Sequence, residues 1–279
     1  MTAMELGVQI NLYEETDIPS AFWYASEAGF KRGQVTSHIH GITAEQVRQM
    51  AVAARNQGFH VDAVGCYINP LRLDSADLSG VDAADWQVLA ENMGMMNGVE
   101  RLICWSGTLG KTLNGPNLLN GEEETFSSLY VILSGLRERV RGLPLQLFLE
   151  PFAFHVLDSA DACVRMTRRF PGSEVKVVLD VPNMITTRGF AAQKDLLANF
   201  IAQMAPAVGL VHLKDCDLGP DGQRRFTAPG AGALDYGAYL RAIAQYLPEV
   251  PVIITEVTTI EEMRSAHEFV EGLVREYGL

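Results

Sequence analysis

The stretch Leu145-Gln146-Leu147-Phe148-Leu149-Glu150 is a short, mainly apolar run that ends in a carboxylate. Three further runs of this form follow: Val177-Val178-Leu179-Asp180, Leu210-Val211-His212-Leu213-Lys214-Asp215 and Ile253-Ile254-Thr255-Glu256. Continuous apolar runs of this length are typical of parallel strands that are buried on both faces. Glu150, Asp180, His212 and Glu256 follow one another at spacings of 30, 32 and 44 residues, each close to one strand plus one helix. The four runs therefore predict successive βα units of a parallel sheet.

The same alternation of strands and helices extends to the N-terminus. The complete set of predicted strands is Leu6 to Ile10, Gly33 to Thr36, Val61 to Cys66, Arg101 to Trp105, Leu145 to Glu150, Lys176 to Asp180, Gly209 to Lys214 and Val252 to Glu256. Several of the intervals between them have helical periodicity, and one of these segments opens with the capping box Thr43-Ala44-Glu45-Gln46. Eight βα units of about 35 residues each fit one (β/α)8 TIM barrel, an α/β fold, so we expect a single barrel domain over residues 1–279. A doubly wound open sheet is the alternative, but no GxGxxG motif follows the first strand.

The charge balance bears on the partners of the protein. Lys and Arg number 22 against 34 Asp and Glu, a formal net charge of −12. This balance argues against a nucleic-acid partner, because such binding depends on cationic side chains that neutralise phosphates. The apolar runs are far shorter than a membrane span, and Met1-Thr2-Ala3-Met4-Glu5 does not read as the start of a signal peptide. The four cysteines form no CxxC pair. We therefore expect a cytoplasmic protein with free thiols, no membrane partner and no nucleic-acid partner.

The polar ends of the last four predicted strands have a composition that suits a metal ion. If the strands close into a barrel, Glu150, Asp180, His212 and Glu256 reach the same rim of it. Three carboxylates and one imidazole suit Mn²⁺, Mg²⁺, Co²⁺ or Zn²⁺, and without a cation the carboxylates would repel one another. Taken singly, each residue is better explained as an ordinary polar strand end, so the argument rests on the four together.

These motifs resemble the sugar isomerase and epimerase superfamily with the xylose isomerase-like TIM barrel, which includes ketose 3-epimerases and inosose isomerases and dehydratases. The resemblance covers essentially the whole chain and is carried by Leu149-Glu150-Pro151, Leu179-Asp180-Val181-Pro182-Asn183, His212-Leu213-Lys214-Asp215, the loop from Pro229 to Tyr236, and Thr255-Glu256. It implies that Glu150, Asp180, His212 and Glu256 are the metal ligands and that Mn²⁺ is the preferred ion. It also implies that Glu150 and Glu256 form the catalytic acid/base pair.

The implied reaction is proton abstraction next to the carbonyl of a ketose, keto-inositol or oxo-sugar, with a metal-stabilised enediolate as the intermediate. Loss of a leaving group from the same intermediate would make the enzyme a lyase or dehydratase on 3-oxo-glycosides or inososes. Many family members have a histidine where this sequence has Asn183, which cannot carry a proton near neutrality. A subunit that needs a partner and an apurinic endonuclease are further alternatives, although the charge and the six histidines disfavour the endonuclease.

Further residues near the predicted strand ends are candidates for substrate contacts. We expect His155, Asn183 and Lys214 to bind a small-molecule sugar, and Trp105 to form an apolar wall beside the sugar ring. The pair of histidines in Ser37-His38-Ile39-His40 offers a possible second metal site, with a structural role as the alternative. Assembly as a homo-oligomer or with another subunit is open at this stage.

Overall fold

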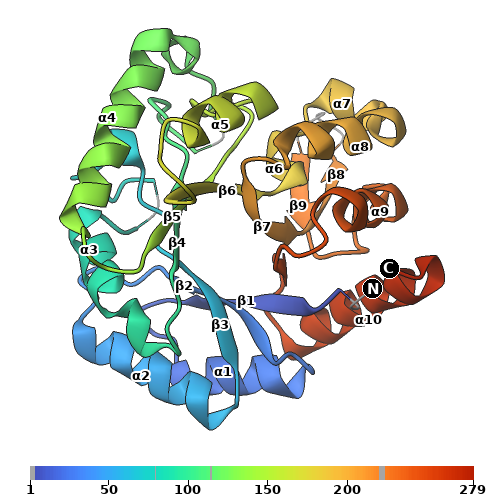
Figure 1. Cartoon of the computed structure of the whole chain (residues 1–279). Helices are drawn as coiled ribbons and strands as arrows, with labels where there is room; N and C mark the ends of the chain where they lie inside the picture. The colour runs from blue at the N-terminus through green and yellow to red at the C-terminus, as the bar shows by residue number, and fades with distance from the viewer. Residues whose placement is uncertain (1–3, 79, 114, 220–223) are drawn as a thin grey trace.

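The computed structural model describes residues 4–78, 80–113, 115–219 and 224–279, and its parallel strands close into a barrel (Figure 1). The barrel strands are β1 (Leu6–Leu12), β2 (Arg32–Ser37), β3 (His60–Gly65), β4 (Arg101–Trp105), β5 (Gln146–Glu150), β6 (Val175–Leu179), β7 (Val208–Leu213) and β10 (Val252–Ile254). Each pairs in parallel with its neighbours in the closed order β1-β10-β7-β6-β5-β4-β3-β2. The expected (β/α)8 TIM barrel is confirmed.

Helices surround the strands on the outside of the barrel (Figure 1). They are α1 (Ile18–Glu27), α2 (Ala44–Asn56), α3 (Ala83–Asn92), α4 (Glu123–Arg139), α5 (Ala160–Thr167), α6 (Val181–Met184), α7 (Thr187–Ala191), α8 (Gln193–Met204), α9 (Tyr236–Tyr246) and α10 (Ile260–Tyr277), with 3-10 turns η1 (Pro70–Arg72), η2 (Met93–Met95) and η3 (Leu118–Gly121). The predicted capping box is present at the start of α2, where the Thr43 side chain accepts a hydrogen bond from the Gln46 backbone N–H. No helix in the described part of the chain combines the length and apolar character needed to cross a membrane.

A hairpin that the sequence analysis does not predict follows β7. It consists of the antiparallel strands β8 (Asp215–Leu218) and β9 (Arg224–Thr227), which form a separate sheet outside the barrel. The Arg224 guanidinium donates hydrogen bonds to the backbone carbonyls of Pro182 and Ile185. These contacts tie the hairpin to α6, which follows directly after the end of β6.

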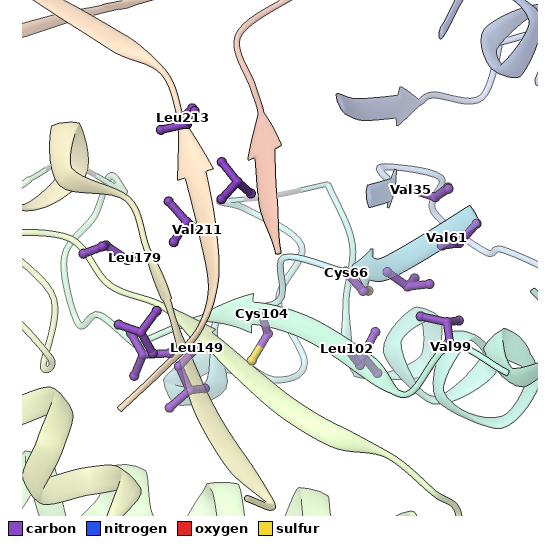
Figure 2. Close-up of a cluster of buried hydrophobic side chains, with 14 of the residues drawn as sticks. Val35, Val61, Cys66, Val99, Leu102, Cys104, Leu149, Leu179, Val211 and Leu213 are labelled. Carbon is purple, nitrogen blue, oxygen red and sulfur yellow. The ribbon is translucent and has the colours of Figure 1, made fainter. Parts of the chain in front are cut away.

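The side chains of the barrel strands alternate between two cores. One set points outward against the helices, and Figure 2 shows part of this outer core, including Val35, Leu149, Leu179 and Val211. The other set points inward and forms a second cluster: Ala63, Tyr67, Ile103, Phe148, Val178, Leu210 and Ile253. We call this second cluster the inner apolar layer. It fills the interior of the barrel below the strand ends at which the candidate ligands lie.

Candidate functional site

Polar side chains lie directly above the inner apolar layer. Glu150 follows Phe148 by two residues on β5, and Asp180 follows Val178 by two residues at the end of β6. Because side chains two apart on a strand share a face, these groups point into the barrel mouth at its C-terminal end. His212 stands in the same relation to Leu210 on β7.

Three of the predicted metal ligands meet at this mouth. Glu150, Asp180 and His212 each offer a ligand atom within 4.8 Å of the others. His212 Nδ1 lies 3.3 Å from Glu150 Oε2 and 3.8 Å from Asp180 Oδ2. All three side chains are buried, with exposed fractions of 4% for Glu150, 1% for Asp180 and 2% for His212. Closure of the barrel therefore brings these three residues together, as their spacing in the sequence predicts.

The charges in this group stabilise one another. Burial by itself raises the pKa of Glu150, but the neighbouring His212 and Lys214 lower it to about 2. Burial lowers the pKa of His212, and the carboxylates of Glu150 and Asp180 raise it to about 9. The His212 imidazole thus carries a proton between the two carboxylates at neutral pH in this structure, and a cation bound there would take the place of that proton.

The Lys214 ammonium lies beside the three ligand candidates. Its Nζ is 3.2 Å from Asp180 Oδ2 and donates a 2.7 Å hydrogen bond to Asn183 Oδ1. The Phe226 ring from the hairpin covers the ammonium at 3.9 Å from the ring centroid. Burial opposes the charge of Lys214, but Asp180 and Glu150 raise its pKa above the ordinary value. Lys214 and Asn183, both expected to contact substrate, therefore lie at the mouth.

The fourth predicted ligand, Glu256, lies apart from the other three. Its carboxylate is 3.7 Å from Lys214 Nζ, so Lys214 bridges it to Asp180, and 43% of its side chain is exposed. The strand β10 ends at Ile254, two residues before the predicted end. Glu256 itself has a φ of 59°, in the left-handed region that side chains other than glycine rarely adopt.

The donor set of Glu150, Asp180 and His212 fits a divalent cation. Two carboxylates and one imidazole are an accepted ligand combination that leaves positions for water or substrate. His212 Nε2 lies 2.8 Å from Gln34 Oε1, which leaves Nδ1 facing the carboxylates. A hydrogen bond on the far nitrogen is the usual support for a histidine ligand.

His155 and Trp105 lie beside this group of residues but differ in whether their side chains are free to contact a substrate. Both nitrogens of His155 are engaged, Nδ1 with Ser106 Oγ at 3.0 Å and Nε2 with the Leu113 carbonyl at 3.1 Å, and the residue is 1% exposed. A sugar contact through His155 would have to break one of these bonds, so its observed role is to hold the loop after β4. The Trp105 ring packs on Tyr67 at 4.4 Å between centroids, at the edge of the mouth.

The two histidines proposed for a second metal site diverge. His38 Nε2 lies 3.2 Å from Asn11 Oδ1, whereas His40 Nδ1 lies 3.0 Å from Asp85 Oδ2. Asp85 Oδ1 also accepts hydrogen bonds from the backbone N–H groups of Gly41 and Ile42. His40 does group with Asp82 and Asp85, but these bonds give Asp85 the structural role of fixing the loop before α2.

Sequence reasoning missed two polar residues inside the barrel. Tyr67 donates a 2.7 Å hydrogen bond to Glu150 Oε2, and Gln34 lies between Tyr67 and His212. The available signal was the weakly apolar character of the second predicted strand, which contains Gln34. Because that strand is buried, a polar residue there needs a partner in the interior.

Known proteins share this architecture. The model of the family described as xylose isomerase-like TIM barrel matches residues 22–272. A D-tagatose 3-epimerase-like protein superposes with a TM-score of 0.71 at 12% identity, covering 99% of this chain and 98% of that chain. D-psicose 3-epimerase from Clostridium cellulolyticum H10 gives 0.66 at 15% identity, covering 97% and 99%.

A third solved structure is a xylose isomerase-like TIM barrel protein from Mycobacterium smegmatis in complex with magnesium. It gives a TM-score of 0.67 at 12% identity, covering 98% of this chain and 97% of that chain. At such identities these likenesses show the fold, and no protein of curated function matches the sequence. The family match spans nearly all of the closed barrel, and the chain therefore belongs to the xylose isomerase-like TIM barrel family.

Proposed function

We propose that this protein is a divalent-metal-dependent isomerase or epimerase that acts on a ketose, keto-inositol or oxo-sugar by proton transfer next to the carbonyl. The observation that carries this proposal is the meeting of Glu150, Asp180 and His212 at the C-terminal mouth of the barrel. Solved structures of the same fold include D-psicose 3-epimerase and L-ribulose 3-epimerase, which supports a sugar substrate.

Glu150, Asp180 and His212 would hold the cation, with Glu256 as the proposed fourth ligand and Mn²⁺ as the expected ion. When bound, a divalent cation withdraws charge from a carbonyl group and acidifies the neighbouring C–H. Mg²⁺, Co²⁺ and Zn²⁺ suit the same donor set.

The two glutamates are the proposed proton carriers. Glu256 is partly exposed and is held near the mouth by Lys214, so its carboxylate can reach a substrate proton. Glu150 is held on both oxygens, by Tyr67 on one and by the Asn183 side-chain amide on the other, at 2.7 Å and 2.8 Å. Such bonds fix the direction of its lone pairs. One glutamate removes the proton and the other returns one, either to the opposite face of the same carbon or to the adjacent carbon.

Other groups at the mouth are suited to sugar hydroxyls. The Trp105 indole N–H and the Thr255 hydroxyl are buried, and neither has a hydrogen-bond partner among the described residues. Buried polar groups of this kind need a partner, which a bound sugar would supply. The Lys214 ammonium adds a positive charge beside the position of the reacting oxygens.

The test is exchange of a substrate C–H with solvent. The protein is loaded with Mn²⁺, incubated in D₂O with a panel of ketoses, inososes and oxo-glycosides, and followed by NMR. We expect deuterium incorporation that EDTA abolishes and that Glu256→Gln abolishes without loss of the fold. Elimination products would favour the lyase alternative, and a panel that shows neither exchange nor elimination would contradict the proposal.

A further inference from the structure

A closed ring of three hydrogen bonds and one ion pair joins two of the candidate ligands through the barrel interior. Gln34 Oε1 lies 2.8 Å from His212 Nε2, and Gln34 Nε2 lies 3.1 Å from the Tyr67 hydroxyl. The Tyr67 hydroxyl donates to Glu150 Oε2, which in turn lies 3.3 Å from His212 Nδ1. Gln34 is fully buried on β2, across the barrel from these ligands.

The chemistry of these groups allows only one direction of donation along the path from His212 through Gln34 and Tyr67 to Glu150. An ionised Glu150 only accepts, so the Tyr67 hydroxyl must donate to it. The Tyr67 oxygen then accepts from the Gln34 amide N–H, which also donates a 2.8 Å bond to Thr36 Oγ1. The amide oxygen of Gln34 is left to face His212, and an amide oxygen can only accept. His212 Nε2 therefore carries a proton, and the second proton of the imidazolium, on Nδ1, is the one that a bound cation would displace.

We propose that Gln34 is a positioning residue that keeps the proton of His212 on Nε2 and so presents Nδ1 to the metal position between Glu150 and Asp180. The inference rests on the proposed function, because it concerns the ligand set of that site. A histidine ligand needs one nitrogen free of a proton and one fixed orientation of the ring. Gln34 supplies both through its bond to Nε2, and Tyr67 fixes the direction of the Gln34 amide.

Gln9 provides a matched comparison within the same barrel. It lies on the adjacent strand β1, and its side-chain amide donates 2.8 Å and 3.2 Å bonds to Thr36 Oγ1 and Asn11 Oδ1. It therefore shares Thr36 with Gln34, while these two bonds reach neither His212 nor Tyr67. Replacing Gln9 with leucine removes a similar amide from the barrel interior and leaves the contacts of the ring in place.

The experiment measures Mn²⁺ binding by calorimetry in the wild type, Gln34→Leu, Gln34→Glu and Gln9→Leu. We expect Gln34→Leu to raise the Kd by roughly 10–100-fold, as is usual for the loss of a group that supports a metal ligand. Gln34→Glu keeps an acceptor for His212 Nε2 but loses the N–H that donates to Tyr67, so we expect its Kd to lie between those of the wild type and Gln34→Leu, whereas Gln9→Leu stays close to wild type. Nitrogen-15 spectra of the Zn²⁺-loaded protein add a direct readout, since the His212 proton lies on Nε2 in the wild type and loses this preference in Gln34→Leu.

Each outcome decides the inference. Equal Mn²⁺ affinity in the wild type and Gln34→Leu overturns the role of Gln34 and leaves the proposed function intact, whereas a wild type that binds no cation overturns both. An equal loss in Gln34→Leu and Gln9→Leu also overturns it, because the effect would then be a general loosening of the barrel. If Gln34→Leu does not fold, Gln34→Met, which is closer in shape to glutamine and also lacks the amide, replaces it, and unchanged Mn²⁺ affinity there contradicts the inference.

Discussion

At the scale of single residues, the backbone of Glu256 has a strained conformation, and the position of this residue at the barrel mouth accounts for it. Among the non-glycine residues that the structure describes, Glu256 and Asn97 have a positive φ. A side chain in the left-handed region costs about 1–2 kcal/mol, and such strain is found preferentially at functional sites. The strained turn directs the Glu256 carboxylate toward Lys214 at the mouth.

Replacing Glu256 with glycine is expected to change stability and activity in opposite directions. We expect Glu256→Gly to raise the free energy of unfolding by about 1 kcal/mol, because glycine adopts this conformation without strain, while C–H exchange is lost. Urea unfolding and deuterium exchange measure the two effects. Asn97→Gly is the control, with a gain of the same sign and unchanged exchange. A Glu256→Gly protein that is less stable than the wild type would contradict the strain argument.

The burial of His155 predicts how the free energy of unfolding depends on pH. Burial lowers the pKa of His155 to about 4, below the value near 6.5 of an unfolded histidine. The unfolded chain therefore takes up this proton first as the pH falls, so the contribution of His155 is complete above about pH 6.5 and is lost progressively toward pH 4. Urea unfolding of the wild type and His155→Gln at several pH values tests this. We expect a shallower loss in the variant, and parallel curves would refute the prediction.

At the scale of elements, the hairpin and the glycine-containing loop after it depend on one carboxylate. Asp215 Oδ1 accepts hydrogen bonds from the backbone N–H groups of Cys216 and Leu234, and Oδ2 accepts one from Gly230. A Cβ at Gly232 would lie 2.4 Å from Asp215 Oδ1, so the loop packs closely on this carboxylate. Asp215 thus holds the segment between the hairpin and α9.

Asp215→Asn places an amide N–H against backbone N–H donors and is expected to destabilise the fold by about 1–3 kcal/mol. Asp217→Asn is a matched control on the same strand, because Asp217 is exposed and accepts a hydrogen bond from the backbone N–H of its neighbour Leu218. Urea midpoints of the two variants provide the measurement. Similar midpoints for both variants would show that Asp215 does not hold the loop.

The sequence predicted the barrel because local periodicity identifies buried strands and helices. The predicted strands agree with the observed ones to within about two residues, as is usual for element boundaries. Hairpin strand Arg224–Thr227 has three polar residues among its four and gives no strand signal of its own, so β8 and β9 were missed. The first helix, α1, was also not identified as a separate segment.

The candidate site was predictable where it follows from topology alone. Closure of the barrel brings the ends of β5, β6 and β7 together, and with them Glu150, Asp180 and His212. The contact between Gln34 and His212 joins residues 178 positions apart in the chain, and it depends on side-chain conformations across the barrel. Periodicity carries no information about such contacts.

At the scale of the whole molecule, we expect the proposed metal binding to be coupled to folding, because the candidate ligands come from separate βα units that converge in the folded barrel. A cation at 100 times its Kd is expected to raise the free energy of unfolding by about 2.7 kcal/mol. Thermal unfolding with and without Mn²⁺ measures this, and His212→Ala, which lacks the imidazole donor, should show little response. An equal rise in both proteins would place the cation elsewhere.

The inner apolar layer fills the interior of the barrel and also closes it below the candidate site. Phe148, Val178, Leu210 and Ile253 lie beneath the ligand candidates, so we expect molecules to reach the site from the mouth above. Substrate and product must then pass through the same opening, and one has to leave before the other arrives. For the proposed sugar isomerase, departure of the product through this mouth is a step that can limit turnover.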